Sequence, residues 1–135
     1  MATIISETNI ITNPQIVADD ERGIIEKLAE GSYQGVLRIT SKAGSVRANH
    51  YHKRDSHICY LVSGKIEYLH RPALNENAPL QREIIEPGQL FYTPPMIAHA
   101  MHFLEDSEFY CFTTQSREQE VYEDDVVRVI LFAPK

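Results

Sequence analysis

The chain has 135 residues, of which 43% are hydrophobic and 24% are charged, a balance typical of one soluble globular domain. Its 13 Lys and Arg and 19 Asp and Glu give a net charge of −6, which argues against general nucleic-acid binding because phosphate partners demand a basic surface. No apolar run approaches the roughly 20 residues of a membrane span, and the first residues lack a signal-peptide pattern. Two cysteines, Cys59 and Cys111, are too few for a disulfide framework, so we expect a cytoplasmic protein.

The elements before residue 35 are predicted from weak patterns. Residues 1–18 alternate apolar and polar side chains only loosely, which predicts an N-terminal arm or an edge strand. In a homodimer, such an arm could add to the sheet of the partner. Within residues 20–31, the pattern predicts a short helix around 24–28.

From Gly35 onward, β-branched and aromatic runs alternate with turn residues at about every eight to twelve positions. This regular short spacing predicts an all-β sandwich or barrel. Residues 71–80 contain two prolines and two asparagines and predict a loop. The predicted strands span residues 35–41, 47–52, 57–63, 65–70, 81–85, 89–93, 99–104, 108–114 and 126–132.

Residues 118–125 carry five carboxylates in eight positions. Such a run predicts a solvated connection before the last strand. A less favoured reading is that Glu123, Asp124 or Asp125 reaches a neighbouring pocket.

Histidines are the most informative residues of this sequence. His50 and His52 lie two apart on a predicted strand, so both side chains point to one face. His57 follows a short turn, and His99 follows the turn at 94–95 in a later strand. Four converging neutral imidazoles would suit Zn, Fe, Ni, Mn or Cu. The two other histidines, His70 and His102, fit no such arrangement and are predicted to lie on the surface.

In spacing, these histidines resemble those of the cupin motifs. The first cupin motif is glycine, five residues, H-x-H, four residues, glutamate, six residues and glycine. Every spacing is kept here, with histidine in the glutamate position. The matching residues are Gly44, His50, His52, His57 and Gly64.

The second cupin motif also resembles a segment of this chain. Gly88, Pro94 and His99 stand at its spacing, whereas Met96 and Phe103 replace its second glycine and its asparagine. The resemblance covers residues 35–114 and implies a single-domain, all-β cupin, a jelly-roll barrel spanning residues 1–135.

The resemblance further implies a metal centre formed by His50, His52, His57 and His99. Because histidine replaces the usual glutamate, the resemblance leaves the identity of the metal open among Zn, Fe, Ni and Mn. The lost carboxylate raises the net charge of the site by one, which favours an anionic ligand or a bound hydroxide.

Three further segments resemble cupins of sugar-nucleotide chemistry, the RmlC-like rhamnose-type 3,5-epimerases and the sugar ketoisomerases. Residues 20–23 are similar to their D-x-R-G segment, and residues 93–101 to I-P-P-G-F-A-H-G-F. Residues 46–50 look like I-R-G-x-H, with Ala48 in the glycine position, and also like the R-G-N-H-Y-H of capsular-polysaccharide cupins.

Carried over to this chain, the resemblance makes His50 the catalytic base of a metal-free epimerase and Arg47 a phosphate contact. A histidine bound to a metal cannot accept a substrate proton, so the two roles of His50 exclude each other. Arg47 lies at an odd offset from His50 and points away from the pocket unless a bulge intervenes. An ordinary surface arginine paired with a carboxylate is an equal alternative.

Other residues complete the predicted site. Tyr92 and Tyr122 are candidate general acids, although strand tyrosines more often serve packing. Cys59 and Met101 are predicted to line the pocket and are candidate substrate contacts, although Cys59 more often serves as a small buried thiol and Met101 as apolar wall. The resemblance implies a homodimeric sugar-nucleotide epimerase or isomerase of polysaccharide biosynthesis, with a small-molecule substrate. The alternatives are an all-histidine iron dioxygenase and a non-catalytic binding cupin.

Overall fold

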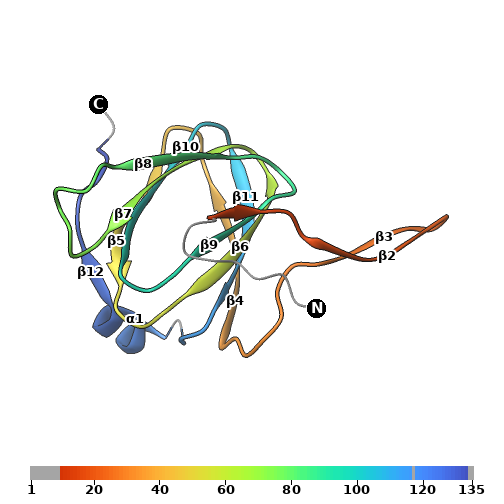
Figure 1. The fold of residues 1–135 in the computed structure, drawn as a ribbon, viewed down its shortest axis with the longest axis horizontal. Helices are drawn as coiled ribbons and strands as arrows, with labels where there is room; N and C mark the ends of the chain where they lie inside the picture. Colours follow the sequence, from red (N-terminus) through yellow and green to blue (C-terminus); the bar gives the residue numbers. More distant parts are fainter. Residues whose placement is uncertain (1–9, 117, 134–135) are drawn as a thin grey trace.

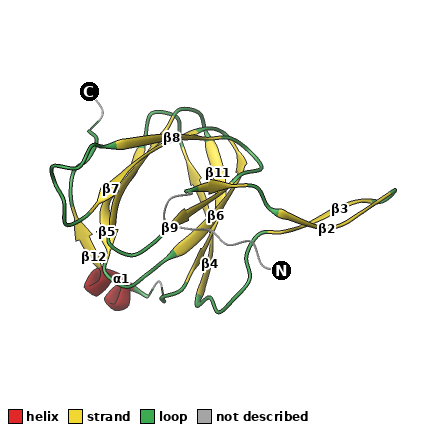
Figure 2. Ribbon diagram, viewed as in Figure 1, coloured by secondary structure: helices red, strands yellow, loops and turns green. Residues whose placement is uncertain are grey.

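Two five-stranded antiparallel sheets form the body of the protein in a computed structural model, which describes residues 10–116 and 118–133 (Figures 1 and 2). The first sheet has the order β1 (Ile11–Thr12), β9 (Leu90–Thr93), β6 (His57–Ser63), β11 (Ser107–Thr113) and β4 (Gly35–Ser41). The second has the order β12 (Val126–Arg128), β5 (Val46–His52), β10 (Ile97–Phe103), β7 (Ile66–Pro72) and β8 (Gln81–Ile85). This arrangement confirms the predicted all-β jelly roll.

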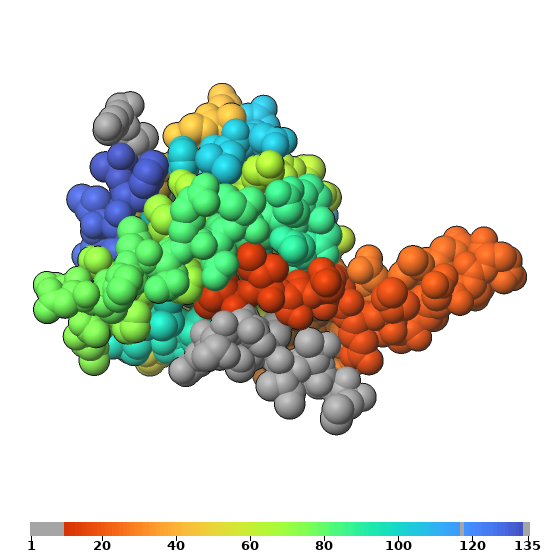
Figure 3. All heavy atoms as spheres, turned by 45° about the horizontal axis from the view of Figure 1, so that its top comes forward, coloured from red at the N-terminus to blue at the C-terminus, as the bar shows by residue number. Residues whose placement is uncertain are grey.

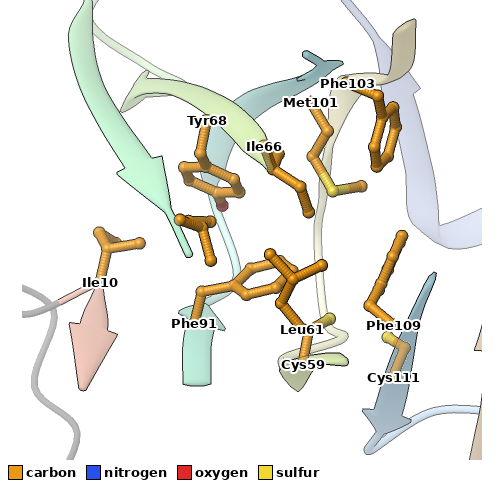
Figure 4. Packing of buried hydrophobic residues seen from close by; sticks show 11 residues of the cluster. Ile10, Cys59, Leu61, Ile66, Tyr68, Phe91, Met101, Phe103, Phe109 and Cys111 are labelled. Atoms are coloured by element: carbon orange, nitrogen blue, oxygen red, sulfur yellow. The ribbon is translucent and has the colours of Figure 1, made fainter. Parts of the chain in front are cut away.

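The interior of the barrel is arranged in layers, because alternate residues of each strand face inward. Along β6 the buried side chains are His57, Cys59 and Leu61, and on the neighbouring β11 Cys111 lies opposite Cys59 and Phe109 opposite Leu61. Along the barrel axis, a layer of histidines at one end is therefore followed by a layer of cysteines and then by an apolar core. Figure 4 shows this core, formed by Ile10, Leu61, Ile66, Tyr68, Ile85, Phe91, Phe103 and Phe109 together with Cys59, Met101 and Cys111.

A β-bulge in β5 changes which side chains face the interior. His50 pairs with His99, but Ala48 pairs with Ala100, so that Asn49 is the extra residue. Ala48 and Asn49 have φ values of 70° and 55°, in the left-handed region. Because of the extra residue, Arg47 lies opposite Met101 and shares its inner face.

The helix predicted around 24–28 is wrong. Residues 15–27 form a hairpin of β2 (Gln15–Asp20) and β3 (Gly23–Lys27) that projects from the barrel (Figures 1 and 3). The turn is fixed by Asp20, whose Oδ1 accepts a hydrogen bond from the Arg22 backbone N–H at 2.9 Å, and by Gly23 at φ 135°. The β-branched residues of this segment favour strands over a helix.

The acidic run 118–125, predicted as a solvated connection, is mostly exposed or half-buried, but Asp125 is turned inward, as in the less favoured reading. The run forms a short helix, α1 (Gln119–Asp125), whose last residue is buried with an exposed fraction of 2%. The predicted final strand is shorter than expected, since β12 ends at Arg128. Beyond it, the Asn49 side-chain oxygen accepts hydrogen bonds from the backbone N–H groups of Leu131 and Phe132.

Other predictions for the chain ends and loops have mixed outcomes. Residues 1–9 of the predicted N-terminal arm lie outside the described residues, and β1 pairs with β9 at the edge of the first sheet. The predicted loop 71–80 is confirmed, except that β7 continues to Pro72. Across the described ranges, no helix is long and apolar enough to span a membrane.

Candidate active site

A cavity of about 140 Å³ lies inside the barrel at its histidine end. The side chains around it come from β4, β5, β6, β10, β11 and α1, so the site is assembled from both sheets. The lining residues are Ile39, Arg47, Ala48, His50, His52, His57, Cys59, His99, Met101, Phe109, Cys111 and Tyr122.

All four predicted metal ligands reach this cavity, but they do not form one compact set. The ring of His50 lies 4.7 Å from that of His52 and 4.8 Å from that of His99, centroid to centroid. One ligand nitrogen from each of these three lies within 4.8 Å of the other two. His57 lies farther from His99, at 6.0 Å between centroids, and groups with other residues.

His52 is held by a buried carboxylate. Its Nδ1 donates a hydrogen bond of 2.9 Å to Oδ2 of Asp125, and both side chains are almost fully enclosed. Nε2 of His52 is buried and has no hydrogen-bond partner. Burial and the nearby His57 lower the pKa of His52, although the two carboxylates Asp125 and Asp55 act in the opposite direction. His52 is therefore a neutral imidazole with an accepting Nε2.

A second buried carboxylate, Asp55, supports His57. Its Oδ2 lies 3.4 Å from Nδ1 of His57. Its Oδ1 accepts hydrogen bonds of 3.0 Å from the backbone N–H groups of Thr114 and Gln115 and from the Thr114 hydroxyl. Burial acts to raise the pKa of Asp55, but His57, the backbone N–H of Gln115 and His52 together bring it below its ordinary value.

His99 is as enclosed as His52, with an exposed fraction of 1% for each. Its Nδ1 donates to the Ile97 carbonyl oxygen at 3.0 Å. Burial, followed by the neighbouring His50 and His57, holds the pKa of His99 well below its ordinary value. His99 is therefore neutral, with Nε2 as its acceptor nitrogen.

The chemistry of the triplet His50, His52 and His99 fits a divalent transition metal. Two of the three are neutral imidazoles whose Nδ1 is engaged by an outer partner, an arrangement that orients the other nitrogen toward a metal. The partnerless Nε2 of His52 is a buried acceptor that a cation would satisfy.

The two predicted general acids have different positions. Tyr122, on α1, lines the cavity with its ring 6.4 Å from that of His50. Tyr92 is not brought to the cavity. It stands on β9 between the buried Phe91 and Thr93, so it faces outward, near Tyr33.

The three predicted substrate contacts all line the cavity. Cys59 and Met101 form part of its wall. Arg47 donates hydrogen bonds to the Ser41 hydroxyl at 2.7 Å and to the Thr40 carbonyl oxygen at 3.0 Å. Arg47 also lines a larger neighbouring groove of about 710 Å³. Arg47 therefore lies between the cavity and the groove, a position that results from the bulge in β5.

The remaining histidines are less exposed than predicted. The His70 side chain has an exposed fraction of 14% and lies on the inner face of β7, opposite His99. His102 lies on the outer face and is half-buried, because Nδ1 contacts Glu67 Oε1 at 3.0 Å and the ring stacks on Phe132.

Sequence reasoning missed Asp55 and gave Asp125 little weight. Nothing in the local sequence separates Asp55 from a surface residue of a polar turn. Asp125 ends an acidic run, and only its helix turns it inward.

The chain is similar to known proteins in fold and family. It matches the family model described as Cupin over residues 28–131. No curated protein matches it. Among solved structures, it is similar to the dTDP-4-dehydrorhamnose 3,5-epimerase from Sulfolobus tokodaii, with 20% identity, a TM-score of 0.64, and coverage of 82% of this chain and 72% of that chain.

Two ketoisomerases are similar to a comparable degree. The sugar 3,4-ketoisomerase from Thermoanaerobacterium thermosaccharolyticum, solved in complex with TDP, is 16% identical with a TM-score of 0.69, covering 87% of this chain and 85% of that chain. A 3,4-ketoisomerase from Helicobacter canadensis is 15% identical with a TM-score of 0.69, covering 87% of this chain and 88% of that chain. These structures share the RmlC-like fold. Since the family model spans most of its length, the chain belongs to the cupin family.

Proposed function

We propose that this cupin is an epimerase or ketoisomerase of nucleotide sugars, which moves a proton at a carbon next to a keto group. The observation that carries the proposal is the buried pair of Asp125 and His52, whose Nε2 has no hydrogen-bond partner. A neutral imidazole fixed by a carboxylate is suited to accept a proton and to stabilise the resulting imidazolium.

The reaction requires no oxidant or reductant. His52 Nε2 takes the proton from the carbon next to the carbonyl. The electrons of the broken C–H bond form the C=C bond of an enolate, whose charge resides on the former carbonyl oxygen. Return of a proton to the opposite face of that carbon inverts it. Where that carbon carries a hydroxyl, its O–H proton passes to the former carbonyl oxygen, a proton adds to the former carbonyl carbon, and the keto group has moved by one position. Tyr122, beside His50 and His52, is the proposed proton donor.

His52 replaces His50 as the favoured base. The resemblance pointed to His50, but Asp125 holds the Nδ1 of His52 and so leaves its Nε2 as the acceptor. His50 then lies beside the base, with its ring 4.7 Å away.

The size of the cavity supports a substrate that enters only in part. About 140 Å³ is the volume of roughly five water molecules, enough for part of a sugar but not for a nucleotide. The groove of about 710 Å³ on the other side of Arg47 contains Lys42, Ser45 and Ser107, together with the carboxylates of Asp106 and Glu108. We propose that Arg47 contacts the diphosphate between the cavity and the groove. Such a substrate is consistent with a role in polysaccharide biosynthesis.

The test is exchange of a substrate C–H for deuterium in D₂O, followed by NMR with a panel of keto-sugar nucleotides. We expect exchange with the wild type and its loss in His52→Gln, while His102→Gln, which changes a histidine of the outer face, retains it. Absence of exchange across the panel would contradict the proposal. Thermal stabilisation by a nucleotide sugar without exchange would instead indicate a binding cupin.

A second candidate is a metal-dependent function, and the observation that favours it is the compact triplet of His50, His52 and His99. These three residues would hold Zn, Fe, Ni or Mn, and such an ion would supply a Lewis acid or, as iron, oxygenase chemistry. Mass spectrometry of protein purified without added metal or chelator measures its metal content. Deuterium exchange that survives chelation would count against this candidate, and dioxygen consumption that requires iron would support it.

A further inference from the structure

We propose that His57, Cys59 and Cys111 form a second, thiolate–imidazole ligand set, on the wall of the same cavity, that binds a thiophilic divalent ion such as Zn²⁺. One ligand atom of each residue lies within 4.8 Å of the other two. None of the three belongs to the triplet of His50, His52 and His99, so this inference does not depend on the proposed function.

The strands fix the three side chains in place. His57 and Cys59 are two residues apart on β6 and share its inner face. Cys111 is directly opposite Cys59 in the antiparallel pairing of β6 with β11. Directly opposed residues of such a pair have Cβ atoms about 4.5–5.5 Å apart. The set therefore sits on the rigid wall of the barrel and not on a loop.

The three residues are buried, which distinguishes them from surface side chains that bind metal ions adventitiously. The exposed fractions of His57, Cys59 and Cys111 are 6%, 1% and 4%. All three line the cavity of about 140 Å³, which supplies room for a fourth ligand such as water. In Figure 4, both cysteines are seen among the buried residues of the core, on β6 and β11.

The donor set selects the class of ion. Two thiolates and an imidazole favour zinc and softer ions over calcium or magnesium. Zinc–sulfur bonds of about 2.3 Å place two tetrahedral ligands roughly 3.8 Å apart. Ligand atoms that now lie within 4.8 Å of one another need approach by at most about 1 Å.

Binding of a divalent ion at this site conserves charge, because it releases two protons. Each Cys Sγ–H loses its proton to solvent as the sulfur–metal bond forms, so that one divalent ion displaces two protons. Two thiolates then neutralise the charge of the ion, which limits the cost of burying it. The contact of His57 with Asp55 is the kind of outer hydrogen bond that supports metal-binding histidines.

The experiment is a titration of the reduced, metal-free, full-length protein with Co²⁺ under anaerobic conditions. Thiolate ligation gives a sulfur-to-cobalt charge-transfer absorption in the near ultraviolet that imidazole ligation lacks. We expect this absorption in the wild type and its loss in Cys59→Ser and in Cys111→Ser. His50→Gln, which removes a member of the histidine triplet, is the matched control and retains the absorption.

The wild-type spectrum decides the outcome even if a cysteine variant does not fold, which far-ultraviolet circular dichroism would reveal. Cobalt binding without the charge-transfer absorption would overturn the proposal, as would the absence of any binding. An absorption that survives in both folded cysteine variants would overturn it as well. None of these readouts requires catalytic activity, so they are independent of the deuterium-exchange test.

Discussion

Asp125, at the end of helix α1, holds the imidazole of His52 at the histidine cavity. Its Oδ2 accepts the hydrogen bond from His52, and its Oδ1 accepts one from the backbone N–H of Arg54 at 2.6 Å. The same carboxylate therefore orients the imidazole and holds the turn that leads from β5 to β6. Asp124, its neighbour, is exposed and forms an ion pair with Arg54 at 2.7 Å.

We predict that Asp125→Asn lowers the rate of deuterium exchange by about 10- to 100-fold. The amide no longer stabilises an imidazolium at His52, while the size of the side chain is kept. The exchange rate at saturating substrate measures the effect, and Asp124→Asn is the control that should leave this rate nearly unchanged. Equal rates for the wild type and Asp125→Asn would exclude the proposed base.

We predict that the metal-free protein loses stability as the pH falls below 6.5, the ordinary pKa of histidine. Burial is the largest cause that lowers the pKa of His52, His70 and His99 in the folded state. Above pH 6.5, both the folded and the unfolded states are mainly neutral at these sites. Below it, the unfolded chain binds protons that the folded protein excludes, so the free energy of unfolding falls.

Urea unfolding in the presence of a chelator, over a series of pH values below 6.5, measures this slope. His70→Gln removes one of the three groups and should make the slope shallower. A free energy of unfolding that stays constant or increases on acidification would contradict the assignment.

At the level of elements, the chain departs at two strained positions from glycines of the segments it resembles, the I-R-G-x-H segment and the second cupin motif. Ala48 and Met96 stand where the resembled motifs have glycine, and both have left-handed φ values, of 70° and 64°. Side chains with a Cβ rarely adopt this conformation. The bulge at Ala48 is nevertheless formed, since Asn49 ties it to the backbone of Leu131 and Phe132.

The turn between β6 and β7 gives a stability prediction. Gly64 has φ 101°, and a Cβ there would lie 2.6 Å from the Asp106 carbonyl oxygen and from the Ser107 Cα. We predict that Gly64→Ala lowers the free energy of unfolding by about 2 kcal/mol or more, because both strain and backbone contact oppose it. Gly44 has φ 87° and open space around it, so Gly44→Ala should cost only about 1 kcal/mol. Urea unfolding compares the two, and a smaller loss in Gly64→Ala than in Gly44→Ala would refute the argument.

At the scale of the whole molecule, the hairpin of β2 and β3 carries apolar side chains away from the core (Figure 3). Ile16, Val17, Ile24 and Ile25 are between 56% and 61% exposed. Burying β-branched side chains of this kind is favourable by about 1.5–3 kcal/mol each. We propose that this hairpin contributes to the interface of a homodimer.

We predict that Ile25→Glu shifts a dimer toward monomer in size-exclusion chromatography with light scattering, since association would bury the new charge. Leu74 is 84% exposed in the loop after β7, and Leu74→Glu is the control expected to leave the dimer intact. A monomeric wild type, or a dimer that Ile25→Glu leaves unchanged, would contradict the role of the hairpin.

The sequence alone determined the all-β class, most strands of the barrel, and the presence of His50, His52, His57 and His99 around one cavity. These features follow from local patterns, because strand periodicity sets which side chains share a face. The spacing of the cupin motifs then predicts, through the fold of that family, that histidines of distant strands lie in one site. The helix predicted around 24–28 failed because its pattern was too short to separate a helix from a hairpin.

The tertiary structure alone decided how the cavity is organised. Asp125 is a partner of His52 because the short helix α1 brings residues 125 and 52 together across the fold. Asp55 is a partner of His57 because the turn before β6 points its carboxylate inward. The bulge at Asn49 turned Arg47 inward, against the parity of a regular strand. Tyr92 was excluded from the cavity and Cys111 was placed opposite Cys59 by strand pairing, a long-range property that no local pattern encodes.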